Sequence, residues 1–227
     1  MLTLTVIVLI VRLTRWIKRK TLRRLQQSRF QGLDFILVLC CFCLAFSENT
    51  ATGQTYQYKV YHGAREIGKM TVSRRDVPGK TIYVMDSRVK VQLFKRFNIV
   101  TKTTLEYRNR ELVEAHTVRM VNDREKINNK TVWSNGRYVL YQEEKINGFF
   151  KKGIPRCTIN MFFEEPTNYR IVYSENLQRM LQIAPVREGQ YALILPDGNK
   201  TVYTYSDGIC LRMESFTTWG PVTLLLD

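Results

Sequence analysis

Histidine, long apolar runs and cysteine beyond the N-terminal region are the scarce features of this 227-residue sequence. Any nucleophilic triad, His-based metal site or proton shuttle must use His62 or His116. No apolar run reaches the about 20 residues that a membrane-spanning helix needs. Three of the five cysteines lie within residues 40–43, and the remaining two, Cys157 and Cys210, lack the spacing and the paired histidine of a zinc site. We therefore expect neither a metal site nor a bound cofactor.

The N-terminal region has the pattern of an export signal. Basic residues up to Arg29 precede an apolar run at 35–44, and Ala45-Phe46-Ser47 places small side chains at the two positions that a signal peptidase recognises. We predict a signal peptide over 32–47, cut after Ser47, and hence an exported protein in the periplasm or outside the cell. The alternative is an uncut anchor. In both cases, contact with the membrane is made only through this segment.

Residues 1–31 form a basic N-terminal extension that carries a second short apolar run. Two explanations stay open: the true translation start lies further along the chain, or the signal is extended. Neither makes the extension part of the fold. The predicted folded part is 48–227, a single domain of about 180 residues, which is long enough for a sizeable core.

Much of the positive charge lies in the N-terminal region. Of the 35 Lys and Arg and 20 Asp and Glu residues, eight and one fall within 1–47, so the net charge drops from +15 for the whole chain to +8 for 48–227. This balance is compatible with a lipid or another anionic envelope component as partner, although basicity also serves solubility alone. Nucleic acid is not expected, because no base-reading motif appears.

Cys157 and Cys210 have two open interpretations. In an oxidising compartment they can pair, and a bridge that closes a loop of about 50 residues stabilises a fold by roughly 4 kcal/mol in the chain-entropy model. As buried free thiols they would instead behave as small apolar side chains. The sequence gives no distance between them, so it does not decide.

Alternating apolar and polar residues predict successive β-strands from Tyr56 onward. Asn135-Gly136, Asp197-Gly198 and Asp207-Gly208 are typical hairpin turns, and turns about ten residues apart indicate an antiparallel meander. We predict an all-β fold of about ten to twelve strands, a curved sheet, roll or incomplete barrel, because sheets this large curl or close. The longest predicted strands are 67–75, 81–91, 97–107 and 112–121.

One segment departs from the strand pattern. Ser174 is a suitable N-cap, and Leu177, Met180 and Leu181 follow it at helical spacing. We therefore predict one short helix over 175–183, within a connection at 162–183 that covers a sheet edge or a barrel mouth.

A basic and aromatic patch is the candidate ligand-binding site. It consists of cationic and aromatic residues close together in the sequence: Lys90, Phe94, Lys95, Arg96, Phe97 and Lys102. A concave face of this kind can hold an anionic amphiphile, with the tail inward and the head group on the lysines. The alternative is an exposed strand that edge lysines keep soluble.

Carboxylates offer the enzymatic alternative. Glu114 and His116 are two residues apart on a predicted strand and share a face, which could orient an imidazole as a general base. Glu164 and Glu165 are adjacent and could serve a hydrolase only if they converge with other groups in a pocket. Turn residues such as Asp197 are explained by the turn itself. No catalytic residue is predicted.

The order of several short motifs resembles a family of uncharacterised exported bacterial proteins, a domain-of-unknown-function group common in Bacteroidetes. The motifs span about residues 55 to 220, and they are Tyr58-x-Val60, Ile67-Gly68, Phe162-Phe163-Glu164-Glu165-Pro166, Tyr173-Ser174-Glu175, Leu195-Pro196-Asp197-Gly198, Tyr203-x-Tyr205 and Gly208-Ile209-Cys210. The resemblance implies an exported all-β domain and carries no catalytic residue. The long basic N-terminus departs from it.

Together these observations predict an envelope or periplasmic protein that binds or carries an amphiphilic or cell-envelope ligand without catalysing a reaction. Two alternatives are kept. An envelope hydrolase requires its carboxylates to meet in one pocket. A structural interaction protein that pairs a free sheet edge with a partner requires a long, unprotected edge strand.

Overall fold

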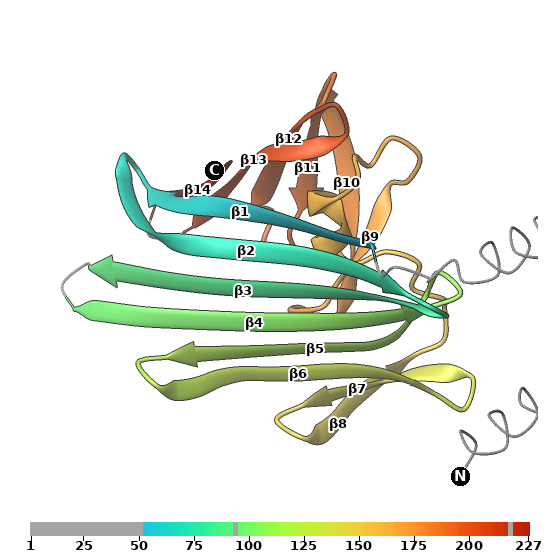
Figure 1. Cartoon of the computed structure of the whole chain (residues 1–227). Coiled ribbons are helices and arrows are strands. Elements are labelled where there is room, and N and C mark those ends of the chain that lie inside the picture. Colours follow the sequence, from blue (N-terminus) through green and yellow to red (C-terminus); the bar gives the residue numbers. More distant parts are fainter. Residues whose placement is uncertain (1–51, 93–94, 218–219) are drawn as a thin grey trace, which may run out of the picture. The chain divides into compact units, whose positions relative to one another are not determined.

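The computed structural model describes residues 52–92, 95–217 and 220–227 (Figure 1). The signal peptide, its cleavage after Ser47 and the N-terminal extension lie outside the described residues, so the domain division stays a prediction. The described residues form fourteen strands and one short 3-10 helix. Their bounds are β1 Thr52–His62, β2 Arg65–Val77, β3 Lys80–Gln92, β4 Arg96–Arg108, β5 Glu111–Val121, β6 Arg124–Ser134, β7 Arg137–Gln142, β8 Lys145–Phe150, η1 Thr158–Phe162, β9 Ile171–Ser174, β10 Arg179–Arg187, β11 Gln190–Ile194, β12 Lys200–Ser206, β13 Ile209–Thr217 and β14 Gly220–Leu226.

All fourteen strands belong to one antiparallel sheet with the order β8-β7-β6-β5-β4-β3-β2-β1-β14-β13-β12-β11-β10-β9. Two meanders, β1–β8 and β9–β14, are joined where the first strand pairs with the last, with Tyr58 opposite Leu226. The sheet curves but does not close, so β8 and β9 are its edges (Figure 1). This confirms the predicted all-β meander, and the strand count exceeds the predicted ten to twelve.

Two of the three predicted hairpin turns have the type I′ backbone, whereas at Asp197-Gly198 only Gly198 has a positive φ, of 82°. Asn135 and Gly136 have φ of 50° and 77°, and Asp207 and Gly208 have 51° and 76°. A type I′ turn requires positive φ at both central residues, which Asn, Asp and Gly tolerate best. These turns set the register of β6 with β7 and of β12 with β13.

The helix predicted over 175–183 is wrong, because this segment is the turn between β9 and β10 and the first half of β10. Leu181 and Ile183 are buried while Gln182 between them is exposed, so the inward face repeats every two residues and not every 3.6. The short helix is η1, which precedes the predicted position. No helix of the described residues is long and apolar enough to cross a membrane.

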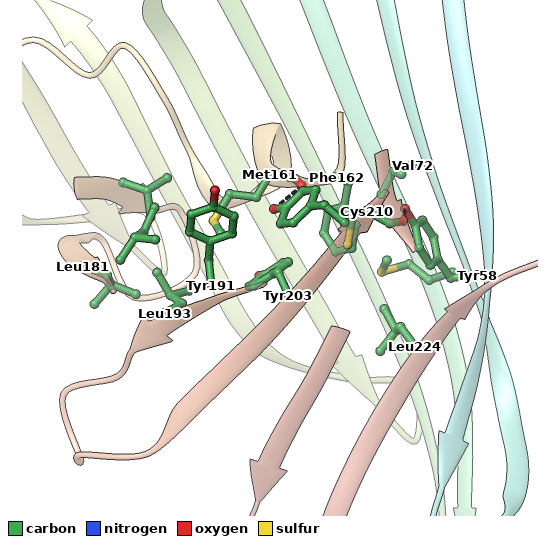
Figure 2. Close-up of a cluster of buried hydrophobic side chains, with 14 of the residues drawn as sticks. Tyr58, Val72, Met161, Phe162, Leu181, Tyr191, Leu193, Tyr203, Cys210 and Leu224 are labelled. Atoms are coloured by element: carbon green, nitrogen blue, oxygen red, sulfur yellow. Dashed lines mark hydrogen bonds between the residues drawn. The ribbon is translucent and has the colours of Figure 1, made fainter. Parts of the chain in front are cut away.

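The core lies inside the curve of the sheet, with η1 between the two meanders. Phe162 of η1 packs edge-on against Tyr58 of β1 and Tyr203 of β12, with ring centroids 5.3 and 5.9 Å apart. Figure 2 shows this cluster, in which side chains of β1 and β2 meet those of β10–β14. Ile159 of η1 belongs to a second cluster with residues of β3–β5 and β7. The segment around η1 therefore fills one end of the interior.

Candidate functional site

The unfilled end of the interior contains a cavity of about 390 Å³. Strands β2, β3 and β4 are 13 residues long and continue past the segment around η1. The lining residues of the cavity come from the end of β1, the start of β2, the end of β3 and the start of β4. Tyr83 and Tyr107, which pack near η1, lie at the other ends of β3 and β4. The cavity and η1 are therefore at opposite ends of these strands. We call this cavity the apolar pocket. Its volume is within the range of about 300–1,000 Å³ that small-molecule sites occupy.

Branched aliphatic side chains form most of the wall of the apolar pocket: Val60, Ile67, Val89, Val91, Ile99 and Val222. Of these, only Val60 is fully buried, and the other five are half-buried. The sequence produces this wall by simple alternation, since every second residue of β3 and β4 faces inward. Apolar groups that stay in contact with water around a hollow are typical of a surface that another molecule covers.

Three side chains of the apolar pocket have polar atoms: His62, Thr101 and Arg119. Arg119 lies opposite Thr101 in the β4–β5 ladder, and its Nε donates to Thr101 Oγ1 at 3.2 Å. Burial disfavours the charged guanidinium and lowers the pKa of Arg119 from its ordinary value. At the next inward-facing pair of the same ladder, Thr103 and Thr117 share a buried hydrogen bond of 3.1 Å. The pocket therefore has a polar side on β4 and β5, and His62 of β1 is its third polar side chain.

The predicted basic and aromatic patch is divided between the two faces of the sheet. Phe97 lines the apolar pocket. Lys90 and Lys102 are exposed on the outer face, because each follows an inward-facing residue in a strand. Lys95 and Arg96 are exposed near the β3–β4 turn, and Phe94 lies outside the described residues. The expectation that lysines and aromatics share one concave face is wrong, since adjacent strand residues point in opposite directions.

Arg119 was not among the residues that the sequence indicated. The strand at 112–121 was predicted correctly. Counting in twos from the buried Ala115 and Thr117 puts Arg119 on their face, so alternation alone could have located it. His62, one of the two histidines of the sequence, is half-buried and lines the apolar pocket.

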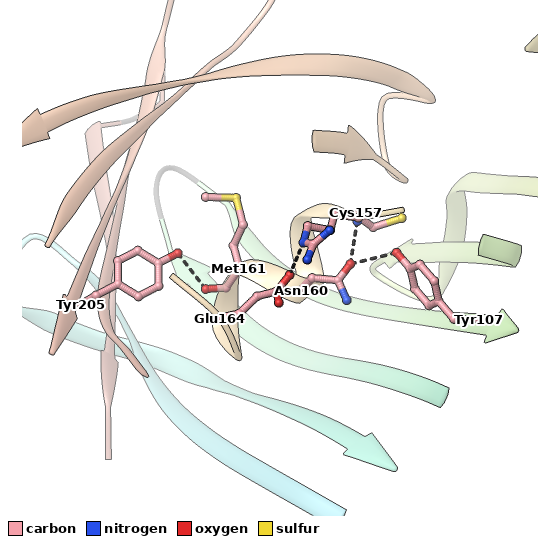
Figure 3. Close-up of polar contacts among 7 residues, drawn as sticks. Tyr107, Cys157, Asn160, Met161, Glu164 and Tyr205 are labelled. Atoms are coloured by element: carbon pink, nitrogen blue, oxygen red, sulfur yellow. Dashed lines mark hydrogen bonds and ion pairs between the residues drawn. The ribbon is translucent and has the colours of Figure 1, made fainter. Parts of the chain in front are cut away.

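A second, polar cavity of about 620 Å³ lies at the η1 end of the strands. Arg156 and Glu164 form an ion pair of 2.6 Å there, and the Tyr107 hydroxyl donates to Asn160 Oδ1 at 2.8 Å (Figure 3). Lys80 of this cavity pairs with Glu106 at 3.3 Å. Although this cavity is the larger, these cations already have carboxylate partners, so we favour the apolar pocket as the candidate site.

The groups that a hydrolase would need do not converge. Glu114 pairs with Lys130 at 3.2 Å, whereas His116 Nε2 contacts Asn128 Oδ1 at 2.9 Å. Glu164 pairs with Arg156, and Glu165 accepts a hydrogen bond of 2.7 Å from the Tyr191 hydroxyl.

The histidines and carboxylates of the described part of the chain form no metal site either. No group of three or more His, Cys, Asp and Glu side chains there is arranged to hold a metal ion.

Cys157 and Cys210 are buried and free, so the structure contains two thiols and not the disulfide. They belong to different core clusters, Cys157 with Ile159 and Cys210 with Phe162. Burial raises the pKa of the Cys210 thiol to about 12 and also raises that of Cys157. Neither thiol has the lowered pKa of a reactive cysteine.

Comparisons with known proteins agree with the fold. A family model described as "Domain of unknown function (DUF6134)" matches residues 58–227. The chain is also similar to a solved structure from Brucella abortus, a beta-barrel-like protein of domain of unknown function DUF1849. That match has a TM-score of 0.51 and 12% identity, and it covers 78% of this chain and 95% of the other. At this identity the likeness concerns the fold alone. No curated protein matches the chain.

Proposed function

The chain belongs to the DUF6134 family of domains of unknown function, and we propose that it binds or carries a small amphiphilic ligand in the apolar pocket, without catalysing a reaction. The observation that carries the proposal is the wall of half-buried aliphatic side chains around a cavity of about 390 Å³. Burial of apolar surface contributes about 25 cal/mol per Å², so a hydrocarbon chain placed there gains affinity from every methylene it removes from water.

The location of this activity is part of the proposal. The basic stretch, the short apolar run and the small residues before Glu48 support export to the periplasm or the outside of the cell. Amphiphiles of the cell envelope are abundant in that location. A lipid or another anionic envelope component is therefore the partner that we propose.

The two alternatives receive less support. A hydrolase lacks a converging set of carboxylates among the described residues, as given above. A structural role through edge pairing would use β8 or β9, which are only six and four residues long. Phe149 of β8 is exposed, and the guanidinium carbon of Arg137 lies 4.1 Å from its ring centroid. Short and charged edges of this kind protect a sheet against further pairing.

A filled-pocket variant tests the proposed function. We would measure binding of dodecanol to the full chain by equilibrium dialysis, at concentrations at which the alcohol remains monomeric. Val89→Trp places a large ring in the apolar pocket, whereas Lys90→Trp places the same ring on the outer face of the same strand. We expect Val89→Trp to weaken binding at least about tenfold, which corresponds to about 1.4 kcal/mol, and Lys90→Trp to leave it unchanged.

Two results would contradict the proposal. The first is no binding of dodecanol, or of an ionic amphiphile with the same chain, to the wild type. The second is equal binding by wild type and a folded Val89→Trp variant, which would place the ligand elsewhere.

A further inference from the structure

Arg119 differs from the other buried or half-buried cations near the two cavities. Its guanidinium has five N–H groups, of which Nε donates to Thr101. None of the ion pairs among the described residues includes Arg119. In the polar cavity, by contrast, Arg156 pairs with Glu164 and Lys80 with Glu106. Arg119 is thus a cation that lines an apolar hollow without a carboxylate of the described chain beside it.

Such an arrangement costs free energy unless an anion completes it. A charge that leaves water is stabilised mainly by an opposite charge and by hydrogen bonds to its remaining donors. The neighbours of Arg119 across the ladders are Thr101 and Ile127, and neither carries a charge. A guanidinium matches the planar, bidentate geometry of a carboxylate or phosphate. An anionic head group on the ligand would therefore supply the charge partner of Arg119.

We propose that the ligand of the apolar pocket is a single-chain amphiphile with an anionic head group, a carboxylate or a phosphate, that pairs with Arg119. This inference rests on the proposed function and specifies its ligand. The head group lies beside Arg119 and Thr101, on the polar side that β4 and β5 form. The chain lies against the aliphatic wall that includes Val89 and Ile99. A volume near the lower end of the small-molecule range favours one hydrocarbon chain.

The test compares ligands that share one chain and differ in the head group. Dodecanoate, dodecyl phosphate, dodecanol and dodecylammonium would each be dialysed against the full chain below their micelle concentrations. We expect at least one of the two anions to bind about tenfold or more tightly than dodecanol, and dodecylammonium to bind more weakly than dodecanol. The relative affinities of the two anions distinguish a carboxylate ligand from a phosphate ligand.

Variants of Arg119 and Lys102 test which residue causes the preference for an anionic ligand. Arg119→Met keeps an unbranched apolar stem and should remove the anion's advantage over dodecanol when both ligands are measured with this same variant. Lys102→Met removes one positive charge from the outer face of β4 and should keep the preference. Arg119→Lys keeps the positive charge but lacks the planar guanidinium that binds two oxygens at once, so it should retain part of the preference for the anion.

The outcomes separate the two proposals. If dodecanol binds and neither anion binds more tightly, the head-group inference is wrong, and the proposed binding of an amphiphile in the apolar pocket stands. If no ligand binds, both are wrong. If a folded Arg119→Met variant keeps the anion preference, Arg119 is not its source and the inference also fails. Should both Arg119 variants fail to fold, the comparison of the four ligands on the wild type still tests whether the pocket prefers an anionic head group.

Discussion

Asn160 ties the segment inside the sheet to the wall around it, and its replacement should be costly. Its Oδ1 accepts from the Tyr107 hydroxyl at 2.8 Å and from the Cys157 N–H at 2.6 Å (Figure 3). All three residues are buried. Asn160→Ala removes the shared acceptor and leaves two buried donors unpaired, each at about 1–3 kcal/mol. We therefore expect the free energy of unfolding to fall by about 2–6 kcal/mol.

Tyr107→Phe is the matched control for this variant. It removes one donor but keeps the bond from Cys157 to Asn160, so we expect a loss of about 0.5–1.5 kcal/mol, the net contribution of one hydrogen bond. Urea denaturation of the full chain, followed by circular dichroism in the far ultraviolet, measures both losses. A single hydrogen bond contributes about 1 kcal/mol net. The reasoning is refuted if the free energy of unfolding of Asn160→Ala falls by less than about 1 kcal/mol relative to wild type, or if the two variants lose equal amounts.

Two further predictions concern buried titratable groups. Burial raises the pKa of Glu175, although its carboxylate accepts from the Thr158 hydroxyl at 2.8 Å. The folded state thus holds this proton to higher pH than the unfolded chain, and the stability of wild type relative to Glu175→Gln should decrease as pH rises from about 4 to 7. Urea titrations of both proteins at several pH values check the sign, and a rising difference would contradict it. Cys157 and Cys210 should resist iodoacetamide in the folded chain and react in urea without reductant, because both are buried thiols. Peptide mass mapping reads each site, and two residues that stay unlabelled in urea would indicate a disulfide instead.

Much of the fold could be predicted from local patterns. Two-residue alternation predicted the strands from Tyr56 to Val121, and Asn135-Gly136 and Asp207-Gly208 predicted hairpins, because both effects act between residues close in the sequence. The prediction of a helix over 175–183 was wrong because a local pattern was outweighed by packing against distant residues. Leu177, Met180 and Leu181 fit a helical period, but packing of Leu181 and Ile183 against the core favours a strand.

The candidate site could be predicted only in part. A sheet concavity holding an anionic amphiphile was expected around Phe97, and Phe97 does line the apolar pocket. Lys90 and Lys102 lie on the other face of the sheet, as alternation requires, and Lys95 lies near the β3–β4 turn. Arg119 comes from a different strand, and no local pattern connects it to Phe97.

The sequence by itself determined the fold class, since strand alternation and turn residues need only neighbouring side chains to act. It also contains the export pattern, which depends on composition over a few residues. Only the tertiary structure decided that β1 pairs with β14 and that η1 fills one end of the interior and leaves the other end hollow. It alone brought Val60, Val89, Arg119 and Val222 around one cavity. Some of these residues, such as Val60 and Val222, are more than a hundred positions apart. They meet because the curved sheet must cover its apolar inner face, which no short stretch of sequence encodes.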